Sequence, residues 1–143
     1  DAAVPVICLE VGGFPVFGMT GNELKKDFEF INGRFGVDIT RPEHPLAAGF
    51  QGQNLDVFTE NNTLVLGWAR PKETAQGIVH LSGHPDKWVL FAFEKGDKLL
   101  NGVAPERRVG LIISPDGIKE GSSVLKFIDA AVQWCVEDVT REL

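Results

Sequence analysis

A cysteine, two histidines and a glutamate are the residues with which this chain could build a nucleophilic site. Cys8 lies in an apolar stretch near the N-terminus, and His80, His84 and Glu94 follow later in the chain. Catalysis by such a group needs a thiolate within hydrogen-bond reach of an imidazole that an acid orients. No glycine-flanked turn from strand to helix surrounds Cys8. We therefore interpret Cys8 as a small core residue and predict no catalytic nucleophile.

Metal binding is the second chemistry that the residue types allow. Zinc needs three or four convergent nitrogen or sulfur ligands, and the chain offers His44, His80, His84 and two widely separated thiols, Cys8 and Cys135. The spacing of His80 and His84 falls on a strand and a turn, not on one helical face. His44 precedes a proline that is typical of a helix entry. The sequence predicts no metal site and no cofactor.

Carbohydrate binding is the third chemistry, because sugar rings stack on flat apolar faces while their hydroxyl groups take hydrogen bonds. The candidate ligand-binding residues are Phe14, Phe17, Trp68 and Arg70. Glu10 and Glu94 are expected at the carboxyl ends of strands, where ligands of open α/β sheets lie. We expect Trp68→Ala to weaken glycan binding without unfolding the domain.

Composition bounds the class of protein. The chain has 143 residues, 43% of them hydrophobic and 24% charged, which predicts one globular domain over residues 1–143. A net charge of −6 argues against a nucleic-acid partner, and no apolar run is long enough for a membrane span. The start at Asp1 suggests a processed protein or an excised domain. A disulfide between Cys8 and Cys135, and glycosylation of Asn61, stay open.

Strands and helices must position these residues. Residues 107–114 form a run that is apolar on both faces, which predicts a buried strand, and helical spacing beyond residues 119–122 predicts a long C-terminal helix. Turn signals predict two hairpins, one joining 55–58 to 63–68 and one joining 76–81 to 87–93. We also expect strands at 4–10 and 36–40, a helix at 23–30 and a helical turn at 44–50. The predicted fold is α/β, with a mixed, mostly buried sheet and flanking helices.

Four segments resemble one known family. They are residues 44–50 (HPLAAGF), 67–71 (GWARP), 104–110 (APERRVG) and 127–134 (FIDAAVQW). Their order and spacing resemble the C-terminal part of ThuA-like (trehalose-utilisation-like) modules, relatives of the class I glutamine amidotransferase fold. The resemblance covers roughly residues 4–134. The chain lacks the strand-helix-strand unit that usually precedes this region, and it lacks the glutaminase nucleophile.

The resemblance implies a secreted, carbohydrate-associated domain. We therefore expect an extracytoplasmic, non-catalytic binding or assembly module. Its expected partners are a carbohydrate, further copies of the chain, or the missing upstream domain that would cover an exposed sheet edge. The alternative is a sugar-modifying enzyme of the ThuA-like group, with Glu10, His80, His84 and Glu94 as acid–base candidates.

Overall fold

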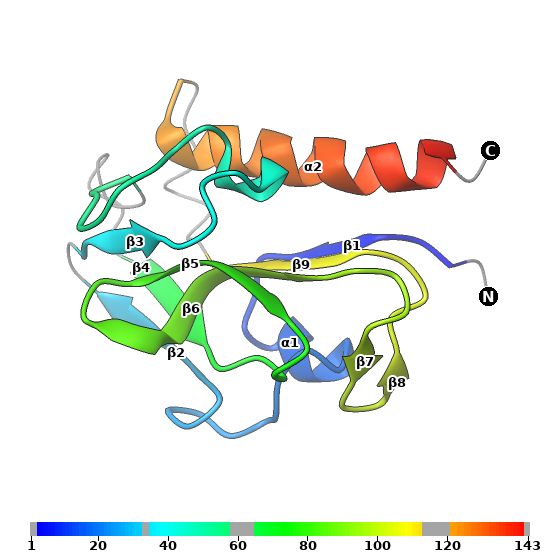
Figure 1. Ribbon diagram of the computed structural model, residues 1–143. Coiled ribbons are helices and arrows are strands. Elements are labelled where there is room, and N and C mark those ends of the chain that lie inside the picture. The colour runs from blue at the N-terminus through cyan, green and yellow to red at the C-terminus, as the bar shows by residue number, and fades with distance from the viewer. Residues whose placement is uncertain (1–2, 33–34, 58–64, 113–120, 142–143) are drawn as a thin grey trace.

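A curled, seven-stranded sheet forms the centre of the molecule, with helices on both of its faces (Figure 1). The computed structural model describes residues 3–32, 35–57, 65–112 and 121–141. The strands of this sheet are β1 (Val6–Cys8), β2 (Phe28–Asn32), β3 (Val37–Ile39), β4 (Val65–Ala69), β5 (Gln76–Leu81), β6 (His84–Phe93) and β9 (Arg108–Leu111). A separate small hairpin consists of β7 (Lys98–Leu99) and β8 (Gly102–Val103).

Strand β6 organises the sheet because it is the longest and has neighbours on both sides. Its antiparallel partner β5 lies along one side and continues the sheet to β3. Along the other side, β6 pairs with β9 near its end and with β4 near its start. Strand β1 adds to β9 in parallel, and β2 adds to β4 in an antiparallel direction. The sheet is thus mixed, as the sequence predicts.

Two hydrophobic clusters fill the space between the sheet and its helices. Helix α2 (Ser123–Arg141) and the short helix η1 (Pro45–Ala47) cover one face (Figure 1). Phe127 and Trp134 of α2 pack there with Leu46 of η1. The opposite face carries α1 (Gly13–Val16), whose Phe14 packs against Phe91 of β6 with ring centroids 5.3 Å apart. The predicted long C-terminal helix and mostly buried sheet are therefore confirmed.

The helix predicted for residues 23–30 is wrong. The carboxylate of Asp27 accepts a hydrogen bond from the backbone N–H of Glu23 at 2.9 Å, and the Asp27 N–H donates back to the Glu23 carbonyl at 2.8 Å. Lys25 between them has a positive φ of 70°, which ends any helix. An aspartate side chain that accepts a hydrogen bond from a nearby backbone N–H in this way favours a turn over a helix. Phe28 then begins strand β2.

The hairpin predicted between residues 55–58 and 63–68 also differs from the structure. Strand β4 has β2 on one side and β6 on the other, so it has no free edge for residues 55–58. Leu55 instead forms an isolated bridge with Val37. The predicted turn of this hairpin and Asn61 lie outside the described residues. The second predicted hairpin is confirmed as β5 and β6.

Candidate functional site

A pocket of about 300 Å³ opens where β2 and β4 face the turn between β5 and β6. Its apolar wall includes Trp68, and its polar wall carries both hydrogen-bond donors and acceptors. The full lining is Glu29, Ile31, Phe35, Gly36, Asn54, Trp68, Leu81, Ser82, His84 and Lys87. Most ligand pockets in proteins combine an apolar lining with a few converging polar groups. This pocket is therefore the candidate site.

Trp68 is one of the residues that line the pocket. Glu29 is its direct cross-strand neighbour on β2, which places the carboxylate beside the indole on the same face of the sheet. Only 1% of Trp68 is exposed, and it also belongs to the core under α2. Replacing it by alanine would cost about 3–5 kcal/mol of stability. The expectation that Trp68→Ala leaves the fold intact therefore conflicts with its burial.

Two cations lie over the Trp68 ring. The guanidinium carbon of Arg70 is 4.8 Å from the ring centroid, and the ammonium of Lys87 is 4.7 Å from it. Arg70 is held in place, because its Nε donates to the Asp86 carboxylate at 2.8 Å and its Nη1 to the Lys26 carbonyl at 2.6 Å. The hydrogen bond from Arg70 to the Asp86 carboxylate lowers the pKa of Asp86. Lys87 makes no ion pair with any residue that the structure describes.

The turn between β5 and β6 presents a fixed hydroxyl to the pocket. Ser82 Oγ donates to the Asp38 carboxylate at 2.6 Å, and the same carboxylate oxygen accepts the Asn54 backbone N–H at 2.9 Å. The Ser82 bond, followed by the Asn54 bond, lowers the pKa of Asp38, so its carboxyl is ionised at neutral pH. With its proton committed to Asp38, the Ser82 oxygen offers its lone pairs to a ligand.

The thiol of the considered triad, Cys8, lies in the core, and the exposed Glu10 lies nearby in the sequence. Cys8 Sγ donates to the Glu10 carbonyl at 3.2 Å, and burial raises the pKa of this thiol. Glu10 itself is an exposed residue after β1. Cys8 packs in the core under α1 with Phe14. The interpretation of Cys8 as a core residue is confirmed, and both it and Cys135 are free cysteines.

The two histidine candidates of the considered triad lie on different strands. His80 is buried on β5, with its Nδ1 2.8 Å from the Leu81 carbonyl oxygen and its ring edge-on to Trp88 at 5.3 Å. His84 starts β6, is exposed, and is the one acid–base candidate that lines the pocket. Among the described residues, no group of three His, Cys, Asp or Glu side chains is arranged to hold a metal ion.

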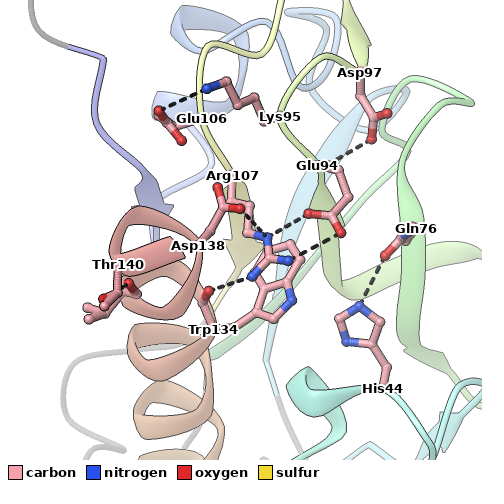
Figure 2. A network of polar contacts seen from close by, with 11 residues as sticks. His44, Gln76, Glu94, Lys95, Asp97, Glu106, Arg107, Trp134, Asp138 and Thr140 are labelled. Carbon is pink, nitrogen blue, oxygen red and sulfur yellow. Dashed lines mark hydrogen bonds and ion pairs between the residues drawn. The ribbon is translucent and has the colours of Figure 1, made fainter. Parts of the chain in front are cut away.

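Glu94 belongs to a structural network (Figure 2). Its carboxylate accepts from Nε and Nη2 of Arg107 at 2.6 and 3.5 Å. Arg107 also donates from Nη1 to the Trp134 carbonyl at 2.7 Å, and its guanidinium stacks 4.1 Å from the Trp134 ring centroid. Asp138 Oδ1 lies 3.8 Å from Arg107 Nε. Glu94 and Arg107 thus join the sheet to helix α2.

His44 lies at the edge of the same network (Figure 2). Its Nδ1 accepts the Leu46 backbone N–H at 3.0 Å at the start of η1, so the neutral ring carries its proton on Nε2, 3.1 Å from Gln76 Oε1. The ring packs against Trp134 with centroids 5.5 Å apart. Burial lowers the pKa of His44. This arrangement suits a helix cap.

The predicted aromatic ligand set does not form one site. Phe14 is fully buried under the sheet face that α1 covers. Phe17 packs against the same cluster, beneath the Arg108 guanidinium at 5.4 Å, and its carbonyl accepts from Arg108 Nη1. Trp68 and Arg70 lie in the other region, and of the four only Trp68 lines the pocket. The structure therefore separates the two phenylalanines from Trp68.

Sequence reasoning missed the pocket residues Glu29, Asn54, Ser82 and Lys87. One available signal was the alternation of Phe28, Glu29, Phe30 and Ile31, which is typical of a strand and would have placed Glu29 on the face of Ile31. The pairing of Glu29 with Trp68 arises from sheet register, for which the sequence carries no local signal.

Comparisons with known proteins give a distant structural likeness. No family model and no curated protein matches the chain. A solved structure named as a cytoplasmic protein from Salmonella typhimurium superposes with a TM-score of 0.44 and 11% identity. The match covers 76% of this chain and 39% of the other, so the chain spans well under half of that protein. Within the described residues, no helix has the length and apolar character needed to cross a membrane.

Proposed function

We propose that this chain is a non-catalytic binding module that holds a carbohydrate in the Trp68 pocket. The observation that carries the proposal is the pocket lining, in which an indole lies beside a carboxylate, an ammonium and a hydroxyl within about 300 Å³. Pockets of ligand-binding proteins range from about 300 to 1,000 Å³, so this volume suits one sugar unit. Glu29 accepts hydrogen bonds, Lys87 donates them, and neighbouring sugar hydroxyl groups can do both.

The non-catalytic part of the proposal is supported by the partners of the acid–base candidates. Glu94 is bound to Arg107, and the His80 ring is buried against Trp88. Glu10 and His84 are exposed, Glu10 after β1 and His84 at the start of β6. A general acid and base must both reach the reacting group, which this arrangement does not favour. ThuA-like membership and an extracytoplasmic location belong to the same proposal.

Sugar binding is tested by isothermal titration of the purified chain with a panel of neutral and acidic monosaccharides. We expect weak but saturable binding of at least one sugar. Glu29→Gln removes the carboxylate charge while keeping its shape, and it should weaken binding about fivefold, as expected for loss of a charged hydrogen bond. Glu10→Gln is the matched control, because Glu10 is an exposed glutamate outside the pocket lining.

The enzyme alternative is tested in parallel by incubating the same sugars with the chain and following product formation. The proposal expects no turnover. Turnover that Glu10→Gln or Glu94→Gln abolishes would replace the binding module with the sugar-modifying enzyme. If no sugar in the panel binds, the carbohydrate proposal fails.

A further inference from the structure

Lys87 is a pocket cation that forms no close ion pair within the described part of the chain, although its charge, after the larger effect of Arg70, helps to lower the pKa of Asp86. Its ammonium lies on the Trp68 ring, and no carboxylate among the described residues forms an ion pair with it. Arg70, on the same ring, is already bound to Asp86 and to the Lys26 carbonyl. Arg70 is therefore fixed, whereas Lys87 can leave the ring for a better partner.

The position of Lys87 makes ligand charge matter. The side chain is half-buried and lines the pocket together with Trp68. A neutral sugar that takes the place of the ammonium in the pocket supplies only neutral hydrogen bonds in return. A sugar with a carboxylate supplies the counter-charge as well, because hydrogen bonds between charged groups are about twice as strong as neutral ones.

Resting on the proposed carbohydrate function, we propose that the pocket selects an acidic sugar, a monosaccharide unit that carries a carboxylate, and that Lys87 determines this specificity. Glu29 lies beside Trp68 on the neighbouring strand and would accept hydrogen bonds from sugar hydroxyl groups. The opposite charges of Lys87 and Glu29 give the ligand one orientation, with its carboxylate toward Lys87. A carboxylate carries one charge, which matches the single charge of the Lys87 ammonium, whereas a doubly charged phosphate would meet a stronger repulsion from Glu29.

Direct comparison of ligands tests the proposal. Glucuronate, galacturonate, glucose, galactose and glucose 6-phosphate are titrated into the chain, with calorimetry and tryptophan fluorescence as readouts. We expect the uronates to bind about fivefold more tightly than the matching neutral sugars, as a partly exposed ion pair allows, and to lose this advantage at high salt. The phosphate ester should bind no better than the neutral sugar.

Variants separate this proposal from the one on which it rests. Lys87→Met should lower uronate affinity more than it lowers neutral-sugar affinity, so that the uronate and the matching neutral sugar bind about equally. Lys98→Met on β7 is the matched control, since Lys98 is exposed and outside the pocket lining. Circular dichroism confirms that each variant is folded.

The outcomes are distinct. Equal binding of uronates and neutral sugars, or a uronate preference that survives Lys87→Met, overturns the acidic-sugar proposal and leaves the carbohydrate proposal standing. Tighter binding of the phosphate ester overturns the choice of carboxylate. Binding of none of these sugars removes both proposals, whereas selective uronate binding that depends on Lys87 supports both.

Discussion

Replacing Arg107 by methionine should destabilise the domain, because Arg107 connects the network of Figure 2. The Arg107 side chain is only 8% exposed, and it joins Glu94 on the sheet to the Trp134 carbonyl on α2. Methionine retains much of the apolar length but donates no hydrogen bond. Glu94 would lose its partner, and the Asp138 carboxylate, whose Oδ2 already has no hydrogen-bond partner, would lose its nearby cation.

The expected cost follows from these contacts. Breaking a buried ion pair by removing one partner costs about 3–5 kcal/mol. The Glu94 side chain is 39% exposed, so water stabilises part of its released charge, and we expect the lower end, about 3 kcal/mol. For a domain of this size such a loss lowers the melting temperature by about 6–12 °C.

Urea unfolding followed by circular dichroism measures this cost, with Lys98→Met, at an exposed position outside the network, as a control. The double variant Glu94→Gln/Arg107→Met should lose less than the sum of the single variants, because the two side chains act together. A loss below about 1 kcal/mol for Arg107→Met would show that the network does not hold α2 on the sheet. Additive losses would show that Glu94 and Arg107 act independently.

Two further predictions concern His44 and the thiols. Because burial lowers the pKa of His44 in the folded chain, the unfolded chain takes up the proton first as the pH falls. The free energy of unfolding should therefore have its full value above the ordinary histidine pKa of about 6.5 and decline as the pH falls through that value. The decline should be smaller in His44→Gln and unchanged in His84→Gln. Equal pH profiles for the wild-type chain and His44→Gln would contradict this prediction. Burial raises the pKa of Cys135 to about 11 and also raises the pKa of Cys8. A thiol reagent at pH 8 should therefore label both cysteines only when the chain unfolds. Rapid labelling of the native chain would show an exposed thiol and contradict this prediction.

The parts of the fold that the sequence predicts are those with strong local patterns. Strand β9 is apolar on both faces, and α2 repeats its apolar residues at helical spacing. The η1 turn follows from His44 and Pro45, which cap and begin it. In each case the residue pattern within the segment itself indicates its secondary structure, so the sequence alone predicts the segment.

The failures arise where contacts between distant residues override local preference. Leu24 and Phe28 have helical spacing, yet Leu24 is exposed and Phe28 is buried against the sheet beside Ala69. The turn at Asp27 and the pairing of β2 with β4 determine the conformation of this segment. The same pairing brings Glu29 to Trp68 and thereby creates the pocket wall. Composition identified Trp68 as a ligand candidate, but the residues around it depend on strand register.

The most direct test of the Trp68 pocket is a nuclear magnetic resonance titration of the ¹⁵N-labelled chain with galacturonate. We predict saturable shifts of the Trp68 indole N–H and of the backbone amides of Ser82 and Lys87, while amides of α1 stay unchanged. Spectra that do not change, or shifts confined to the α1 side around Phe17 and Arg108, would contradict the pocket as the site of binding.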